Sequence, residues 1–296
     1  MINISCPLCD NDNYTVTSDA CLDSINNSFD YLTESPTHYR IVQCNICGMK
    51  YSNPILSDIE IIELYKSSCI NNCVRVDESA SIRINMISYF SRLLSHSSVS
   101  KGKFLDIGCG CGHLLKYASE RGFEVAGIDP AQNAIIHARQ LVEAGDIREG
   151  IYTLDSYPEN YFDLISCIHV IDHVVDPKLL LKAAYKHLKH GGYMIIATHN
   201  MNSLLARVSG KTFIAYSIQH ITYFTPSLLK KMAEQCGFSS VTIKRSLSTY
   251  TLRHYAENGF RSHKIRKLFL SILTFFRVDS LQLSFPFGNM ELIVKK

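Results

Sequence analysis

The sequence predicts an α/β protein in which a doubly wound, mostly parallel, seven-stranded sheet follows a small metal-binding module. Three observations support this prediction. Short apolar strands alternate with amphipathic helical segments over residues 101–296, which is typical of a parallel sheet with helices on both faces. A glycine-rich turn at residues 108–112 joins a buried strand directly to a helix. Two Cys-x-x-Cys pairs lie near the N-terminus and predict the separate module.

Size and composition agree with this organisation. The 296 residues are enough for one large domain and a small additional module. The net charge of +3 does not favour a nucleic acid partner. The N-terminus lacks the pattern of a secretion signal, and the longest apolar run, Leu268–Phe276, is too short for a transmembrane segment. We therefore expect a cytoplasmic protein with reduced cysteines.

The first element is the module that carries the two cysteine pairs, which are Cys6 with Cys9 and Cys44 with Cys47. Each pair can form a tight turn that presents two thiolates, and two such turns complete a tetrahedral zinc site. Four thiolates leave no open coordination position, so the zinc would be structural. The alternatives are a redox-active pair and four unrelated buried cysteines. We expect this module at residues 1–55, a helical linker or lid at 56–100 and the α/β domain at 101–296.

The α/β domain should contain seven strands in chain order. These are expected at residues 104–107, 123–129, 147–152, 161–168, 193–198, 239–245 and 289–295. Glycine and proline positions mark the helices between them. Helices are expected at 113–121, from Pro130, at 177–189 and at 226–236, where Thr225 caps the last one.

The spacing in the glycine-rich turn discriminates between nucleotide cofactors. A dinucleotide fingerprint would require a third glycine at position 113, which is a histidine, whereas the third glycine here is Gly112. The strand at 123–129 ends in Asp129, at about the distance where such folds hold ribose hydroxyls. An NAD-dependent dehydrogenase is therefore disfavoured.

With Asp106 before the glycines and Gly-Ile-Asp129 after them, this half of the chain resembles the class I S-adenosyl-L-methionine-dependent methyltransferases, which have a Rossmann-like fold. The resemblance implies that the glycine loop carries the methionine part of S-adenosylmethionine and that Asp129 accepts bonds from the ribose. It places residues near Gly150 and Ile151 beside the adenine. The implied cofactor-binding residues are Asp106, Gly108, Cys109, Gly110, Gly112, Asp129, Gly150, Ile151 and His169.

The segment from Ser166 to Pro177 resembles the region after the fourth strand of small-molecule methyltransferases, with Asp172-His173 where those enzymes usually have Glu-His. In the ubiquinone-pathway O-methyltransferases a carboxylate three residues earlier joins a metal site, and here that position is His169. His169, Asp172 and His173 could therefore bind a divalent cation. We favour the alternative, in which Asp172 and His173 cap the next helix and line the cofactor pocket without metal.

Residues 198–200, 206–207 and 219–226 are similar to methyltransferases linked to sugars and surface polysaccharides. Versions of these enzymes with a zinc ribbon resemble this chain over nearly its whole length. The resemblance implies methylation of a small-molecule or glycan acceptor, on a hydroxyl, with His220 as the general base. Two alternatives stay open: an RNA methyltransferase that recognises RNA through the ribbon, and a non-catalytic binding protein with a degenerate methyltransferase fold.

A basic and apolar segment at residues 251–280 interrupts the last two strands. The apolar run Leu268–Phe276 is preceded by Arg253, Arg261, Lys264, Arg266 and Lys267. We expect an amphipathic helix that covers the sheet and keeps a solvated basic face. The alternative is peripheral contact with a membrane surface or with a polyanionic acceptor such as a lipid-linked glycan.

Overall fold

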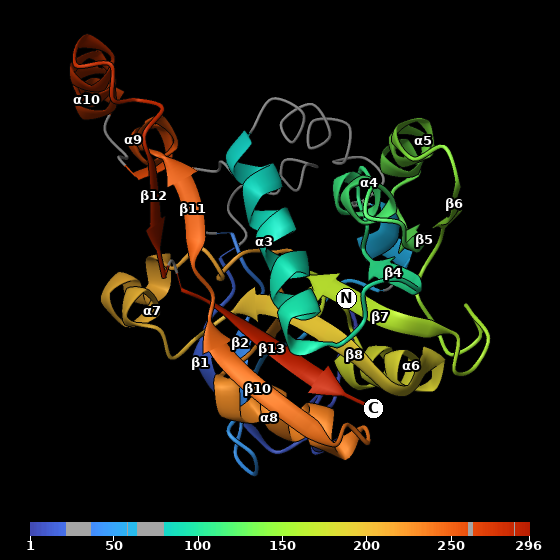
Figure 1. Cartoon of the computed structure of the whole chain (residues 1–296). Coiled ribbons are helices and arrows are strands. Elements are labelled where there is room, and N and C mark those ends of the chain that lie inside the picture. The colour runs from blue at the N-terminus through green and yellow to red at the C-terminus, as the bar shows by residue number, and fades with distance from the viewer. Residues whose placement is uncertain (22–36, 58, 64–79, 260–262, 287) are drawn as a thin grey trace.

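A seven-stranded sheet forms the centre of the computed structural model, which describes residues 1–21, 37–57, 59–63, 80–259, 263–286 and 288–296 (Figure 1). Its strand order is β10-β13-β8-β7-β4-β5-β6. The bounds are β4 Lys103–Ile107, β5 Glu124–Asp129, β6 Gly145–Glu149, β7 Phe162–Ile168, β8 Leu188–His199, β10 Ser240–Arg245 and β13 Asn289–Lys295. Strands β4 to β8 are parallel, and β13 is antiparallel to both β8 and β10. The predicted doubly wound fold is confirmed.

Helices cover both faces of this sheet, and each face has its own apolar core. On one face lie α3 (Ala80–His96), α4 (His113–Ser119) and α5 (Gln132–Leu141). On the other lie α6 (Pro177–His187) and α8 (Pro226–Gln235). Phe90 is fully buried on the α3 face and packs edge-to-face on Phe104 and Phe123. Truncating such a side chain to alanine typically costs about 3–5 kcal/mol.

The starts of the helices follow the expected capping chemistry, with one exception. The Thr225 hydroxyl accepts a hydrogen bond from the Leu228 amide and caps α8, as predicted. The prediction that Pro130 opens a helix is wrong. α5 begins at Gln132, because Asp129 accepts the Ala131 amide and holds Pro130 in the turn before the helix.

The N-terminal module forms a small antiparallel sheet that continues into the larger domain. Its strands are β1 (Tyr14–Ser18), β2 (Ile41–Cys44) and β3 (Lys50–Ser52), and β3 pairs with β9 (Thr222–Tyr223). Two segments that are far apart in sequence therefore share one sheet. Of the linker or lid expected at residues 56–100, residues 58 and 64–79 lie outside the described part of the chain.

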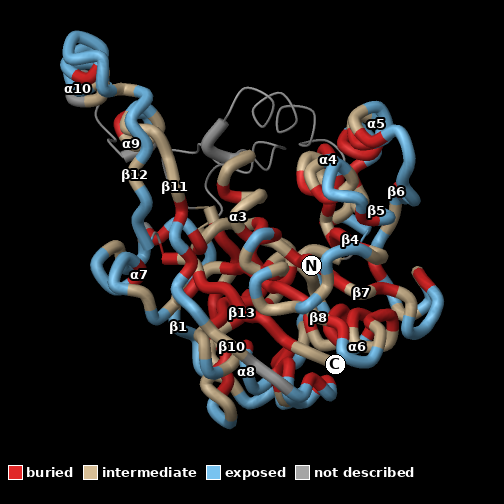
Figure 2. The backbone as a smooth tube through the Cα atoms, viewed as in Figure 1, coloured by how far each residue is buried: buried red, intermediate tan, exposed pale blue. Residues whose placement is uncertain are grey.

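Residues 248–259 and 263–285 form an arm that extends from the body of the molecule (Figure 1). It consists of β11 (Ser248–Thr251), α9 (Leu252–Gly259), α10 (His263–Phe275) and β12 (Gln282–Phe285). The prediction of an amphipathic helix in this segment is correct, but the prediction that it covers the sheet is wrong. α10 lies at the far end of the arm, where most of its residues are exposed (Figure 2).

Candidate active site

The glycine loop between β4 and α4 has an open face. Gly108 and Gly110 have φ values of +70° and +49°, which favour glycine. A Cβ at Gly108 would collide with the side chain of Val170, so the loop after β7 packs directly against this turn. A Cβ at Gly110 would have no heavy atom within 4 Å. A ligand can therefore approach the backbone at Gly110.

Hydrogen bonds to β5 and the turn after it hold the glycine loop in place. The Gly108 amide donates to the Ile128 carbonyl at 2.8 Å, and the Gly110 amide donates to Asp129 Oδ2 at 3.0 Å. Asp129 Oδ1 accepts the Ala131 amide at 2.9 Å. Because these two loop amides already have partners, the loop offers a ligand the open backbone at Gly110 and carbonyl oxygens. Carbonyl oxygens suit a ligand that carries an ammonium group.

Asp106 lies beneath this loop rather than at its open face. Its carboxylate is buried and accepts a hydrogen bond from the Ser166 hydroxyl at 2.6 Å. Burial raises the pKa of Asp106 to about 7, with a smaller contribution from the charge of Asp129. Asp106 therefore supports the loop from inside the sheet, and its contact with a cofactor stays a prediction.

The other predicted cofactor residues lie along the same edge of the sheet. Asp129 is half-buried at the end of β5, and the Gly150 amide donates to its carbonyl at 3.0 Å. A Cβ at Gly150 would also meet open space, and Ile151 is exposed. His169 follows β7 directly and donates its amide to the Ala197 carbonyl. Parallel strands place their ligands at this carboxyl edge.

The four predicted metal-binding cysteines come together in the N-terminal module. The Sγ atoms of Cys6 and Cys47 are 3.4 Å apart, and Cys9 Sγ lies 3.5 Å from the Sγ atoms of both Cys44 and Cys47. All four are free thiols, and their sulfur atoms lie within 4.8 Å of one another. A tetrahedral zinc with Zn–S bonds of about 2.3 Å requires sulfur–sulfur distances of about 3.8 Å. The cluster therefore fits a four-thiolate zinc site.

A second polar cluster lies where β7 and β8 end. The carboxylate of Asp172 is buried, and its Oδ2 lies 2.9 Å from His199 Nδ1 and 3.8 Å from His220 Nε2. The Nδ1 atom of His220 lies 2.7 Å from the Ser217 hydroxyl. The ligand atoms of Asp172, His199 and His220 lie within 4.8 Å of one another. The cluster thus brings together residues that are 21 to 48 positions apart in sequence.

The electrostatics of this cluster separate its charged and neutral members. Burial alone would raise the pKa of Asp172, but the neighbouring imidazoles of His173 and His199 hold it well below its usual value. Burial lowers the pKa of His220 well below its usual value and that of His169 to about 4. Near neutral pH the cluster therefore combines an ionised carboxylate at Asp172 with a neutral imidazole at His220. Such a group can accept a proton or hold a divalent cation.

One expectation about this region changes, and one residue joins the site. The prediction that Asp172 and His173 cap the next helix is wrong, because the cap of α6 is Asp176, which accepts the Leu179 amide at 2.8 Å. Asp172 instead faces His199, a residue to which sequence reasoning gave no role. The signal for His199 was its position at the end of β8, next to β7 in the sheet. Its distance from Asp172 along the chain concealed the pairing.

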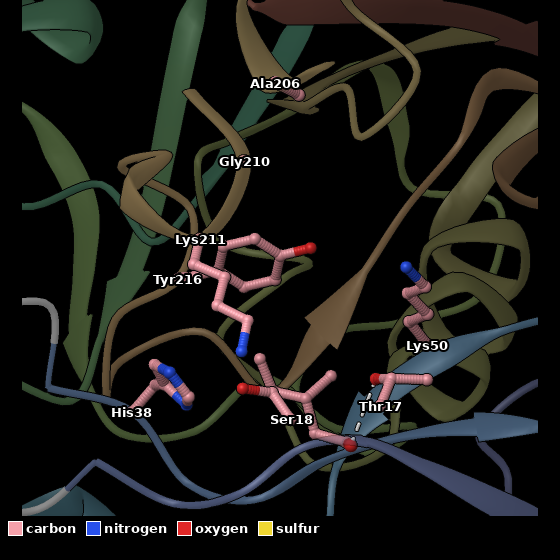
Figure 3. A pocket seen from close by; sticks show the side chains of 9 residues that line it. Thr17, Ser18, His38, Lys50, Ala206, Gly210, Lys211 and Tyr216 are labelled. Atoms are coloured by element: carbon pink, nitrogen blue, oxygen red, sulfur yellow. Dashed lines mark hydrogen bonds between the residues drawn. The ribbon is translucent and has the colours of Figure 1, made fainter. Parts of the chain in front are cut away.

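A cavity of about 250 Å³ lies between the N-terminal module and the segment after β8 (Figure 3). It is lined by Thr17, Ser18, His38, Ile41, Lys50, Ala206, Gly210, Lys211 and Tyr216. Figure 3 shows Lys50 and Lys211 on opposite sides of it. Neither lysine forms an ion pair with any described residue. The lining therefore combines hydroxyl groups with two cations and suits a polar, anionic ligand.

Comparison with known proteins identifies the family. A family model described as a methyltransferase domain matches residues 83–243, which is more than half of the chain. The chain belongs to this methyltransferase family. The fold of this methyltransferase is similar to a crystal structure of a SAM-dependent methyltransferase from Archaeoglobus fulgidus. The TM-score is 0.51 and the identity 23%, over 73% of this chain and 93% of that one. Membership of this family supports S-adenosylmethionine as the cofactor.

Curated relatives of this methyltransferase include ubiquinone biosynthesis O-methyltransferases. The protein of that name from Idiomarina loihiensis is 33% identical over 153 residues, which are 48% of this chain and 63% of that protein. The one from Pseudomonas putida is 27% identical over 190 residues, which are 60% of this chain and 79% of that protein. The match to the Idiomarina protein thus spans less than two thirds of that relative's length. No helix among the described residues is long and apolar enough to cross a membrane.

Proposed function

We propose that the protein transfers a methyl group from S-adenosylmethionine to a hydroxyl of a small-molecule or glycan acceptor, namely a sugar or surface-polysaccharide precursor. The observation that carries this proposal is the cluster of Asp172, His199 and His220 at the carboxyl ends of β7 and β8. It lies beside the strand that carries the glycine loop. S-adenosylmethionine supplies a methyl group activated on a sulfonium. The chain must then orient the acceptor hydroxyl and remove its proton.

We assign cofactor binding to the carboxyl edge of β4, β5 and β6. The open backbone at Gly110 and the loop carbonyls would receive the methionine part, and Asp129 the ribose. Gly150, Ile151 and His169 would border the rest of the nucleoside, while Asp106 supports the loop from below. The open space beside Gly110 and Gly150 supports this assignment, because a side chain at either position would fill it.

Proton removal is assigned to the Asp172 cluster acting as a unit. Among the described residues, no hydrogen bond occupies Nε2 of His199, and the His199 side chain is 16% exposed. His220, which the sequence singled out as the base, is only 4% exposed and is held by Ser217. We therefore propose that His199 receives the proton while Asp172 orients it. His220 would position the carboxylate.

The cavity between the N-terminal module and the segment after β8 supports an anionic acceptor. Lys50 and Lys211 can bind a carboxylate or phosphate, and Ser18, Thr17 and Tyr216 can bind hydroxyl groups. Sugar precursors combine these features. The names of the curated relatives favour a second candidate acceptor, a ubiquinone precursor. In either case we propose that the four-cysteine cluster holds a structural zinc.

Methyl transfer from labelled S-adenosylmethionine tests the proposal. Sugar nucleotides, lipid-linked glycans, ubiquinone precursors and RNA would be offered in parallel, with and without added divalent cations. We expect label on a small hydroxyl acceptor, and a loss of about 10²-fold in kcat for His199→Ala with unchanged cofactor affinity. His190→Ala is the matched control, because His190 is an exposed histidine near the other end of β8. Label on RNA alone, or no transfer by a cofactor-bound protein, would contradict it.

A further inference from the structure

The arm leaves an apolar stripe of α10 exposed. Leu268, Ile272, Phe275 and Phe276 are 63%, 43%, 81% and 65% exposed. Their spacing of four, three and one residues places them on one face of the helix. Leu273, on another face, is buried. The surfaces of soluble proteins rarely carry contiguous large apolar side chains that have no role in binding.

The arm also concentrates the positive charge of the chain. Residues 252–281 contain six Lys or Arg and two Asp or Glu, a net charge of +4, against +3 for all 296 residues. Arg253 forms ion pairs with both acidic residues, Asp279 at 2.7 Å and Glu257 at 3.9 Å. Lys267 and Arg277 are exposed and form no ion pair with any described residue. The exposed charge beside the stripe is therefore basic.

The position of the arm allows an extended surface to reach this helix. β11 and β12 pair only with each other among the described strands, and they carry α9 and α10 away from the seven-stranded sheet (Figure 1). Exposed residues predominate at the end of the arm, whereas residues of the body around β8 and β13 are mostly buried (Figure 2). A flat partner could contact α10 without contacting the catalytic edge.

We propose that α10 binds the surface of an anionic lipid bilayer. The apolar stripe would enter the boundary between headgroups and acyl chains, and Lys267 and Arg277 would contact the headgroup phosphates. Charge complementarity favours a lipid surface over a second copy of this chain, because a second arm would bring the same positive charge. This inference concerns binding alone and does not depend on the proposed function.

Sedimentation of the full-length protein with vesicles tests this proposal. Vesicles of phosphatidylcholine would be compared with vesicles that also contain phosphatidylglycerol. We expect binding to the anionic vesicles that weakens as salt is raised, and at least about tenfold weaker binding for the Phe275→Ser/Phe276→Ser double variant. The control is Leu204→Ser/Val208→Ser, which removes two aliphatic side chains of α7 (Leu204–Ser209) that are each 78% exposed. It should bind vesicles like the unmodified protein.

Thermal unfolding of both double variants would verify that they fold, which we expect because the replaced side chains are exposed. Two results would overturn the proposal. One is an absence of vesicle binding, or equal binding by the Phe275→Ser/Phe276→Ser variant. The other is a dimer in light scattering that this variant dissociates while vesicles bind neither form, which would assign the stripe to a second copy of the chain.

Discussion

Asp106 and Asp172 are two buried carboxylates in adjacent strand regions, yet their charge states differ. The Ser166 hydroxyl is the hydrogen-bond donor found for the Asp106 side chain, so burial dominates and the pKa rises to about 7. Asp172 is surrounded by imidazoles, which keep its pKa well below the usual value. One carboxylate therefore titrates near neutral pH, whereas the other stays ionised and can orient His199.

The raised pKa of Asp106 predicts a pH-dependent stability. The unfolded chain has an aspartate pKa of about 3.9, so the folded state binds more protons between that value and about 7. The stability linked to this proton is present at low pH and is lost as the pH rises through 7. Asp106→Asn keeps the side-chain shape without the charge. The measurement is thermal unfolding of both proteins without cofactor. Between pH 5 and pH 8.5, we expect the free energy of unfolding of the variant to rise, relative to that of the unmodified protein, by on the order of a few kcal/mol. If the difference in free energy of unfolding between the two proteins were the same at both pH values, the prediction would be contradicted.

His199 shows why single residues of the site escape sequence reasoning. The motif around it was recognised, but its partner Asp172 lies 27 residues earlier in the chain. Only the adjacency of β7 and β8 brings the two side chains to 2.9 Å. His220, in contrast, was found by its motif, and the structure adds its burial and its approach to the same carboxylate.

Strand pairing between β3 and β9 connects the cysteine module to the cluster of Asp172, His199 and His220. The Ser52 amide donates to the Ile221 carbonyl at 2.8 Å, and the Ser52 hydroxyl donates to the His220 carbonyl at 3.2 Å. The Ile221 amide donates to the Asp172 carbonyl at 2.8 Å. The strand after His220 is thus held between the module and the loop after β7. The zinc that we propose for this module would supply much of its folding free energy.

Loss of the metal site should therefore reduce methyl transfer more than cofactor binding. For Cys44→Ser we expect loss of one bound zinc in metal analysis and at least about tenfold lower kcat, because β3 no longer supports β9. The affinity for S-adenosylmethionine should change little, since the glycine loop follows β4 of the seven-stranded sheet, whereas β3 and β9 belong to the four-stranded sheet. Cys21→Ser is the control, a free cysteine of the same module outside the cluster. Full activity of the zinc-free protein would refute this coupling.

The elements of the arm show a different limit of sequence reasoning. The apolar and basic pattern of residues 251–280 correctly predicts an amphipathic helix, because periodicity depends on the helix alone. It cannot predict what covers the apolar face, which depends on where β11 and β12 carry the helix. The exposed Phe275 and Phe276 became apparent only from that placement.

The molecule as a whole is a methyltransferase domain joined to a four-cysteine module by one shared sheet. Its fold could be predicted almost completely, since alternating strands and helices with short connections allow few sheet topologies. The join could not, because β3 and β9 are about 170 residues apart and β9 has only two residues. The cavity with Lys50 and Lys211 forms at this join between distant segments. No sequence motif therefore predicted it.

Cofactor binding measured by calorimetry tests the central claim most directly. The claim is that the open backbone at Gly110, with Asp129, holds S-adenosylmethionine rather than a pyridine dinucleotide. Gly110→Val and Asp129→Ala should each weaken S-adenosylmethionine binding at least about tenfold, and NAD should not bind. Gly191→Val is the matched control, because Gly191 also has a positive φ and open space at its Cβ position but lies outside the site. Undiminished S-adenosylmethionine binding by a folded protein that carries both Gly110→Val and Asp129→Ala would contradict the account.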